Sequence, residues 1–195
     1  MTAFHERPSS GPTARRARIL QAILPVIETS RLRLRAPRIE DFEAFAGMVL
    51  GPGGRFFGHP KSREDAWGEF IQLTGTWLLR GHGVWAVTEK PDPAVIGFVQ
   101  IGAEPGDNEP ELGYIFAPEV QGRGLATEAA MAARDQALGP DALDRLVSYI
   151  HPENSASIAL ATRIGGHLDP IAEAAMCEDD DCVVVRHAGP TGSAP

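Results

Sequence analysis

Three apolar segments near the middle of the chain constrain the fold more than any other feature of the sequence. Residues 84–88, 94–101 and 111–116 are rich in β-branched and aromatic side chains, and proline-containing or acidic turn sequences separate them. Short connections between such segments favour neighbouring antiparallel strands. The centre of the chain is therefore predicted to form a three-stranded antiparallel meander.

Elements on either side of this meander indicate the fold class. Apolar side chains recur at helical spacing in residues 38–50, 62–81, 120–138 and 154–164, and further strand-like segments lie at residues 29–36, 145–150, 167–171 and 182–187. The order β-α-α-β-β-β-α-β-α-β-β predicts an α+β fold, with a mixed, mostly antiparallel twisted sheet of about seven strands flanked by about four helices.

The length of 195 residues suits a single domain, which we expect over residues 26–188. Residues 1–25 combine arginines with an interrupted apolar stretch and are expected to form a mobile or peripheral leader. Residues 189–195 are expected to form a flexible tail. No apolar run approaches the roughly 20 residues that cross a bilayer, so no membrane is expected as a partner.

The charges are distributed unevenly. The first 38 residues hold eight arginines against two glutamates, although the whole chain has a net charge of -8, so the remainder is strongly acidic. An acidic surface repels phosphate backbones and attracts cations. Nucleic acid is therefore not an expected partner, and a cationic amine is.

Cys177 and Cys182 are the two cysteines of the chain and flank an acidic stretch. Their spacing fits no zinc site, and two cysteines cannot brace a chain of this size. We expect a reduced, cytoplasmic protein with two incidental thiols and no metal. The alternative is that the segment forms a hairpin across which the two thiols face each other.

The stretch VQGRGLA, residues 120–126, places two glycines in what is predicted to be the first turn of a helix, where each costs about 1 kcal/mol relative to alanine. Amides at a helix N-terminus lack partners within the helix and attract anions, and glycine lets a phosphate come close to them. The stretch lacks the Gly-Lys-Ser/Thr ending of a P-loop, and the strand order argues against a parallel dinucleotide site. A glycine-lined turn with no ligand is the alternative.

Two blocks of the sequence resemble the GCN5-related N-acetyltransferases (GNAT), and within them the ribosomal-protein N-terminal acetyltransferase branch. Residues 121–126, QGRGLA, match the signature Gln/Arg-x-x-Gly-x-Gly/Ala, and residues 151–166 resemble the branch's His-Pro-x-Asn-x-x-Ser segment. Arg163 and Gly166 stand where that segment usually has a lysine and an aromatic residue. The resemblance covers roughly residues 27–187.

The resemblance implies an N-acetyltransferase that moves an acetyl group directly from acetyl-CoA, its co-substrate, to a primary amine. The acceptor would be a protein N-terminus or a small amine, and the enzyme would be a monomer or a homodimer. A non-catalytic acyl-CoA-binding sensor or interaction module is the alternative.

The resemblance also implies which residues bind acetyl-CoA. The amides of the first block would hold its diphosphate, and Arg123 would add a contact to a phosphate. The positions that match are Gln121, Gly122, Arg123, Gly124, Leu125 and Ala126. The main chain at Phe116, with Ala117 beside it, would bind the acetyl carbonyl.

Catalytic roles follow from the same resemblance. Asn154 matches an asparagine that contacts the pantetheine arm or orients the acceptor, with a helix N-cap as the other role. Ser157 is the candidate proton donor to the CoA thiolate, or an ordinary helix serine. Glu111 is the first choice as general base and His151 the second; a surface glutamate and a structural histidine are the alternatives.

A last group of residues belongs to the region that lines the acceptor cleft in this family. Phe56, Phe57 and Trp85 are candidates to contact the acceptor, with core packing as the alternative. His59 and His82 lie in loops on either side of the second predicted helix.

Overall fold

The structure is a computed structural model that describes residues 3–57, 61–139, 143–177 and 182–188. Among these residues eight strands form one sheet in the order β1-β2-β3-β4-β5-β6-β8-β7. Every neighbouring pair is antiparallel except β5 and β6. The strands are β1 Ile27–Glu28, β2 Leu32–Arg35, β3 Val84–Glu89, β4 Val95–Gly102, β5 Glu111–Phe116, β6 Val147–Ile150, β7 His167–Leu168 and β8 Val183–Arg186.

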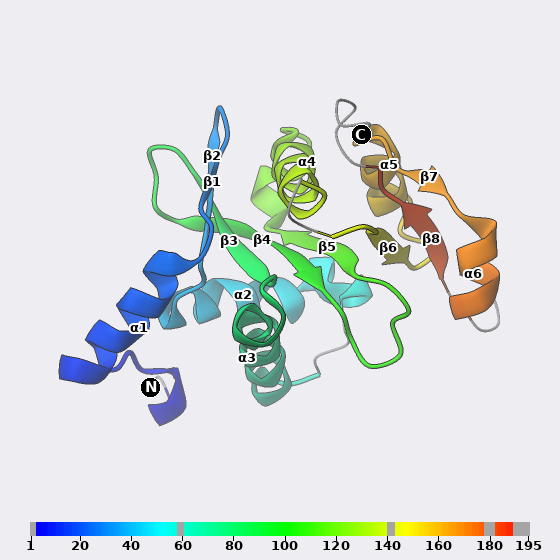
Figure 1. Cartoon of the computed structure of the whole chain (residues 1–195). Helices are drawn as coiled ribbons and strands as arrows, with labels where there is room; N and C mark the ends of the chain where they lie inside the picture. The colour runs from blue at the N-terminus through cyan, green and yellow to red at the C-terminus, as the bar shows by residue number, and fades with distance from the viewer. Residues whose placement is uncertain (1–2, 58–60, 140–142, 178–181, 189–195) are drawn as a thin grey trace.

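Helices cover both faces of this sheet (Figure 1). The α-helices are α1 Gly11–Ile23, α2 Phe42–Val49, α3 Arg63–Arg80, α4 Leu125–Ala137, α5 Ser155–Arg163 and α6 Pro170–Met176. Short 3-10 helices lie at η1 Phe4–Glu6, η2 Ile39–Asp41, η3 Pro52–Phe56 and η4 Pro118–Val120. The α+β class and the mostly antiparallel sheet expected from the sequence are confirmed.

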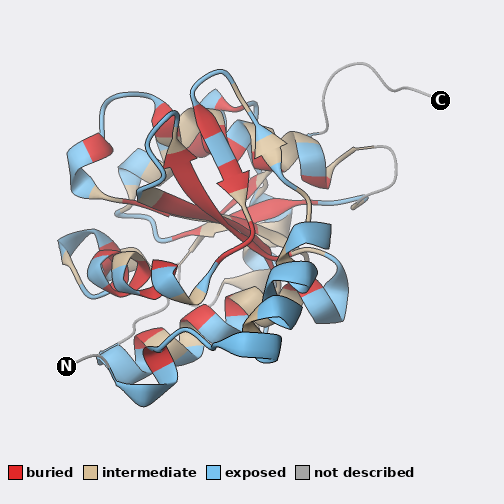
Figure 2. Cartoon of the chain, turned by 90° about the vertical axis from the view of Figure 1, so that its left-hand side faces the viewer, coloured by how far each residue is buried: buried red, intermediate tan, exposed pale blue. Residues whose placement is uncertain are grey.

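The core forms two layers, one on each side of the sheet (Figure 2). Alternate side chains of a strand point to opposite faces, so Trp85 and Val87 pack on the side of α4, while Val84 and Ala86 pack on the side of α2 and α3. The buried face of α4 is formed largely by alanines, which let the helix lie close to the strands. This close approach sets the position of the α4 N-terminus.

Local sequence signals placed α3 correctly. The Ser62 hydroxyl accepts a hydrogen bond from the Asp65 amide at 3.1 Å, which caps the first turn. At the other end Gly81 takes a left-handed conformation with φ 75° and closes the helix.

The glycine-containing stretch differs from the sequence-based prediction. Helix α4 begins at Leu125, so Gly122 and Gly124 precede the helix instead of lying in its first turn. Both have positive φ, 74° and 75°, a conformation that favours glycine over residues with a Cβ. The glycines therefore shape the turn that leads into the helix and do not weaken its interior.

Further corrections concern short or isolated elements. The predicted strand 29–36 is shorter in the structure, as β2 at Leu32–Arg35, and it forms a hairpin with β1 at Ile27–Glu28, which lies before the predicted range. The predicted strand 167–171 ends after Leu168, because the Asp169 carboxylate accepts the Ala172 amide at 3.0 Å and begins α6. Within the predicted leader, α1 is helical although none of its side chains is buried. It lacks the apolar periodicity of a core helix, which is why the sequence did not reveal it.

Strands β5 and β6 diverge, and this divergence positions the site. Their parallel pairing registers at Glu111 and Val147 alone among the described residues. Beyond that point the Ser148 hydroxyl donates to the Leu112 carbonyl at 2.6 Å, in place of a main-chain ladder bond. An opening between the two strands results near the centre of the sheet.

Candidate active site

Two adjoining pockets meet at the opening between β5 and β6. We call the first the turn pocket. It has a volume of about 680 Å³, and the residues that distinguish it include Phe116, Gln121, Gly122, Gly124, Leu125, Ala126 and Arg163. The second, the acidic pocket, has a volume of about 340 Å³ and is lined in part by Gln100, Glu104, Asp107 and Glu111. Both pockets share Phe56, Phe57, Tyr114, Asn154 and Ser157.

The turn pocket lies on the α4 and α5 side of the sheet, and the acidic pocket extends to the other side. Leu112 and Phe116 of β5 pack in the core layer of α4, whereas Ile115 packs in that of α2 and α3. Strand alternation therefore places Glu111 on the α3 side and Tyr114 on the α4 side. A molecule in one pocket reaches a molecule in the other through the opening in the sheet.

The N-terminus of α4 presents main-chain donors to the turn pocket. The first helical hydrogen bond runs from the Glu128 amide to the Gly124 carbonyl at 3.1 Å, so the amides of Leu125, Ala126 and Thr127 have no acceptor within the helix. A Cβ built at Gly122 meets nothing within 4 Å. The turn thus leaves open space beside a positively polarised helix end, which suits a phosphate group.

Arg123 does not lie in this pocket. Its guanidinium pairs with the Glu89 carboxylate at 2.6 Å, and its carbonyl accepts from Arg31 at 3.0 Å. The phosphate contact suggested for Arg123 therefore has no support in the structure. Arg163 of α5 lines the turn pocket instead. The sequence did carry a signal for Arg163, because it stands in the second block at the position where the family usually has a lysine, which is also a cation.

Glu128 attaches the start of α4 to the β1–β2 hairpin. Its carboxylate pairs with Arg31 at 2.6 Å and accepts from the Thr29 hydroxyl at 2.5 Å. Although burial raises the pKa of Glu128, these hydrogen bonds lower it to about 2. The negative charge of Glu128 is compensated by Arg31 and by these hydrogen bonds, so it does not occupy the main-chain donors of the α4 N-terminus.

At the end of β5, the amides of the two positions expected to bind an acetyl carbonyl differ in their hydrogen bonding. The Ala117 amide donates to the Ile96 carbonyl at 3.0 Å and is thus already engaged. Hydrogen-bonding directions alternate along an antiparallel pair, so the Phe116 amide points away from β4 and toward the opening. Of the two, Phe116 has the geometry of a donor to a ligand.

Three residues meet where the pockets join. The side-chain oxygen Oδ1 of Asn154 accepts from the Ser157 amide at 3.2 Å, so Asn154 caps α5, which is one of its two expected roles. The Tyr114 hydroxyl donates to the Ser157 carbonyl at 3.0 Å. Burial raises the pKa of this tyrosine, since its ionised form would be poorly solvated.

Tyr114 is not among the residues expected from the sequence, because no local pattern links it to Ser157. The two residues are 43 positions apart in the chain. The available signal was the two-residue spacing of Tyr114 and Phe116, which places both side chains on one face of β5.

Glu111 is half-buried in the acidic pocket. Burial, followed by repulsion from Asp107 and Glu104, raises its pKa to about 8, and a hydrogen bond from the Tyr149 main chain opposes this shift. A carboxylate of this basicity can accept a proton near neutral pH. His151 lines the same pocket, with its Nδ1 accepting from the Glu153 amide at 3.2 Å.

The sequence profile of a family described as "Acetyltransferase (GNAT) domain" matches residues 31–167. The chain belongs to the GNAT acetyltransferase family. The uncharacterized protein YkkB of Bacillus subtilis (strain 168) is 34% identical over 147 residues, which cover 71% of this acetyltransferase and 83% of the relative.

Solved structures agree with this family. An acetyltransferase from Agrobacterium tumefaciens str. C58 is similar with a TM-score of 0.78 and 36% identity, over 85% of this chain and 95% of that one. RimL, a ribosomal L7/L12 alpha-N-protein acetyltransferase solved in complex with coenzyme A, has a TM-score of 0.64 at 20% identity, over 83% and 95% of the two chains. The second likeness concerns the fold. Family membership makes the chain an acyltransferase that uses acetyl-CoA.

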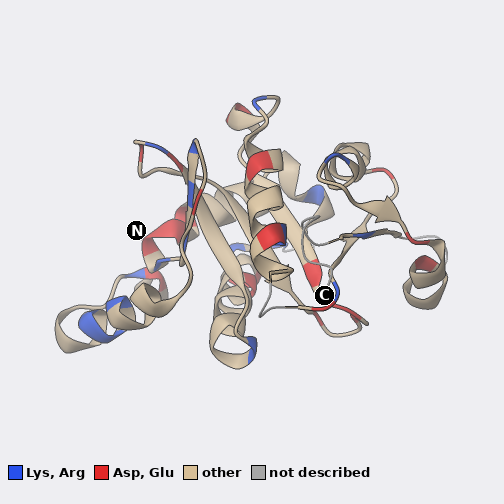
Figure 3. Cartoon of the chain, turned by 45° about the horizontal axis from the view of Figure 1, so that its top comes forward, with Lys and Arg blue, Asp and Glu red and all other residues tan. Residues whose placement is uncertain are grey.

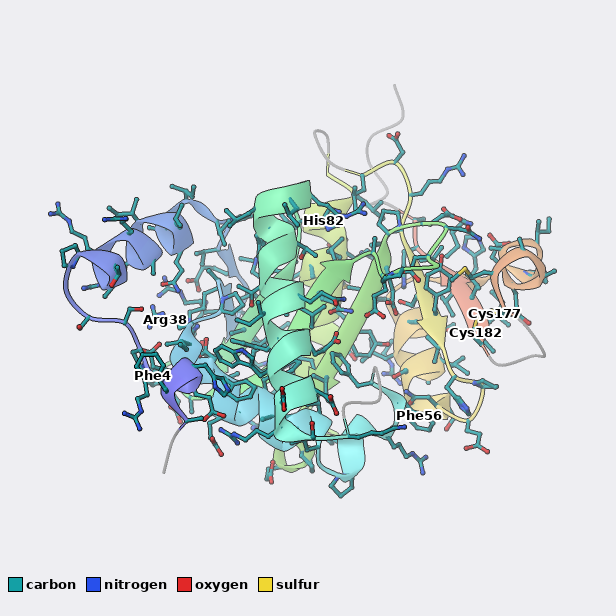
Figure 4. The ribbon with its side chains drawn as sticks, turned by 90° about the horizontal axis from the view of Figure 1, so that it is seen from below. Phe4, Arg38, Phe56, His82, Cys177 and Cys182 are labelled. Carbon is teal, nitrogen blue, oxygen red and sulfur yellow. A yellow bond between two sulfur atoms is a disulfide. The ribbon has the colours of Figure 1, made fainter. Side chains whose placement is uncertain are left out.

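The loop aromatics of the acetyltransferase fall into two groups. Phe56 and Phe57 line both pockets, and the Phe56 ring lies 5.2 Å from that of His151. Trp85 is buried in the core, donates to the Pro25 carbonyl at 2.9 Å and lines neither pocket, in line with the core-packing alternative. His82 lies at the opposite end of α3 from Phe56 (Figure 4). His59 is outside the described residues, as is the predicted tail 189–195.

The expectation of two incidental thiols is wrong. Cys177 and Cys182 form a disulfide with a Cα–Cα distance of 5.4 Å (Figure 4). Cys177 follows the last residue of α6 and Cys182 precedes β8, so the disulfide links the end of α6 to the start of β8. Cys182 and Met176 line the acidic pocket, and the disulfide therefore braces one of its edges.

Within the described ranges, no group of three His, Cys, Asp or Glu side chains is placed to hold a metal ion. No helix in the same ranges is both long and apolar enough to span a bilayer.

Proposed function

We propose that this acetyltransferase transfers the acetyl group of acetyl-CoA directly to a primary amine held in the acidic pocket. The observation that carries the proposal is the meeting of the two pockets at the β5–β6 opening. One offers the donors of a helix N-terminus and the other a carboxyl group with a raised pKa. The coenzyme A complex of RimL, which shares the fold, supports a coenzyme site in this architecture.

The turn pocket fits acetyl-CoA in shape and in chemistry. Gln121, Gly122, Gly124, Leu125 and Ala126 supply the open turn and the main-chain donors for its diphosphate. Arg163 supplies a cation on the facing helix. The Phe116 amide donates to the acetyl carbonyl oxygen and stabilises the negative charge that develops there during attack.

Different residues around the opening carry out the proton transfers to and from the reacting groups. Glu111 removes a proton from the ammonium form of the acceptor, and the neutral nitrogen then forms its bond to the carbonyl carbon while the carbon–sulfur bond breaks. Tyr114 donates its hydroxyl proton to the departing thiolate, a role that Ser157 was expected to fill. The second proton, which the nitrogen loses as the amide forms, restores the Tyr114 hydroxyl. Asn154 and Ser157 position Tyr114 through the α5 cap and the Ser157 carbonyl. We place the enzyme in the cytoplasm, where acetyl-CoA is available.

Release of free thiol from acetyl-CoA tests the proposal. We expect thiol to appear only when an amine is added, because the mechanism has no acetyl-enzyme stage. The panel includes small primary amines and peptides with a free N-terminus, since both types of acceptor present the reacting group. Saturable binding of acetyl-CoA without thiol release on any amine would show a binding module and not an enzyme.

Tyr114→Phe is expected to lower kcat by about 10- to 100-fold, the usual contribution of one positioned proton donor. The ring keeps its packing and the Ser157 carbonyl loses one hydrogen bond, so the KM for acetyl-CoA should change little. The solvent deuterium isotope effect on kcat should also fall. A variant with wild-type kcat and an unchanged isotope effect would return the donor role to Ser157 or to water.

A further inference from the structure

Among the described residues, the carboxylates of the acidic pocket have no cationic partners. Glu104 and Asp107 come from the β4–β5 loop and Glu111 from the start of β5, and all three are half-buried. Other carboxylates of the chain pair with cations, as Asp41 does with Arg35 and Glu109 with Arg186. None of the ion pairs in the described part of the chain includes the three pocket carboxylates.

The shifts in pKa agree with this unbalanced charge. Burial followed by the charge of Asp107 raises the pKa of Glu104, and burial raises that of Asp107. The pKa of Glu69 in α3 is also raised, first by burial and then by the charge of Glu104. No nearby cation lowers any of these values, so the carboxylates repel one another while the pocket is empty. The β4–β5 loop carries no Lys or Arg (Figure 3).

Gln100 provides an independent sign of a ligand. Its side chain is only 5% exposed, lines the acidic pocket and has an Oε1 atom without a hydrogen-bond partner among the described residues. It lies on β4 opposite Gly113, where the absence of a side chain leaves room for the amide. A buried carbonyl oxygen without a donor is unfavourable, so this position favours a ligand that brings an N–H group.

We propose that the acceptor is a small di- or polyamine. Its reacting nitrogen lies at Glu111, while a second nitrogen, which stays protonated at neutral pH, pairs with Glu104 and Asp107 and an N–H group donates to Gln100. The volume of about 340 Å³ corresponds to roughly ten water-sized groups at about 30 Å³ each. That size suits a short linear polyamine. The inference rests on the proposed acetyl transfer and narrows its substrate class.

Matched acceptors test this charge requirement. We expect kcat/KM for butane-1,4-diamine and spermidine to exceed that for butylamine by about tenfold or more, and the preference to shrink as added salt screens the charges. A peptide whose second residue is lysine also has two cationic nitrogens, so it is compared with its alanine counterpart. Lysine peptides used in preference to the free diamines would overturn the assignment to a small amine.

Neutralising the pocket should remove the preference. The double variant E104Q/D107N is expected to lower the diamine-to-butylamine ratio about tenfold. Asparagine at position 107 keeps an oxygen for the Glu104 amide, which donates to Asp107 at 2.5 Å, so the turn is preserved. Loss of the like-charge repulsion should leave the Tm equal to or above that of the wild type. Glu64→Gln, on the exposed face of α3, is the matched control and should keep the ratio.

Thermal shift without acetyl-CoA gives a readout that does not depend on turnover. Butane-1,4-diamine should raise the Tm of the wild type and of Glu64→Gln by more than that of the double variant. Equal use of butylamine and the diamine, or an unchanged ratio in the double variant, would overturn this inference alone. Failure of every amine to release thiol would overturn the proposed function itself.

Discussion

Gly124→Ala is expected to weaken acetyl-CoA binding by about 10- to 100-fold, the loss of one or two charge-assisted hydrogen bonds. Gly124 has φ 75° and precedes the first amides of α4. A methyl group there is expected to hinder the approach of a phosphate to those amides. A built Cβ meets only Arg31, at 3.7 Å, so the variant has room to fold. Calorimetric titration with acetyl-CoA measures the affinity.

Gly81→Ala is the matched control for this substitution. Gly81 has φ 75° and ψ 6°, nearly the same as the 75° and 7° of Gly124, and its Cβ would meet nothing within 4 Å. Both variants should therefore lose similar stability, about 1–2 kcal/mol for a left-handed residue with a Cβ. Only Gly124→Ala should lose affinity. Equal affinities in the two variants would refute the placement of the diphosphate at α4.

Arg123 supplies a second control, because sequence and structure assign it differently. Its ion pair with Glu89 directs it away from the turn pocket. Arg123→Ala is thus expected to bind acetyl-CoA like the wild type. A clear loss of affinity would restore Arg123 as a phosphate ligand.

Glu111→Gln is expected to lower kcat/KM by about 10²- to 10⁴-fold, the range for loss of a general base. In the wild type, kcat/KM should rise with pH through about 8, because only the deprotonated carboxylate accepts the proton from the acceptor. The variant should lose this inflection and retain only the titration of the acceptor amine. If the inflection persists in the variant, the base is His151 or a water molecule.

The stability of Glu111→Gln separates this role from a structural one. The pKa of Glu111 is raised in the folded state, so ionisation destabilises the fold above the unfolded-state pKa of about 4.3, and the effect increases up to about pH 8. The variant should therefore have a higher Tm than the wild type at pH 8 and a similar Tm at pH 4. A lower Tm at pH 8 would show that Glu111 supports the fold.

The fold was largely predictable where neighbouring residues carry the signal. The meander, the caps of α3 at Ser62 and Gly81, and the α+β class all follow from patterns that span a few residues. Helices α1 and α6 were not predicted. The first has no buried face to impose a periodicity, and the second depends on a cap at Asp169 within a short segment that also resembled a strand.

The candidate site was predictable in part. Local sequence patterns indicated residues 121–126 and Asn154, because a turn with positive φ favours glycine and the start of a helix favours a capping side chain. The sequence could not show that Arg123 pairs with Glu89, 34 positions away, or that Tyr114 meets Ser157. It also suggested free thiols, whereas a disulfide joins Cys177, after α6, to Cys182, before β8.

By itself the sequence determined the fold class, the order of most elements and the presence of a glycine-containing turn at the start of a helix, since these depend on backbone preferences and spacings within a few residues. Only the tertiary structure decided which side chains share a pocket. The divergence of β5 from β6 connects the two faces of the sheet. It brings Gln100, Glu104, Asp107 and Glu111 together, and no cation within the described residues pairs with these carboxylates. Such pairings depend on the packing of distant segments, which no local pattern encodes.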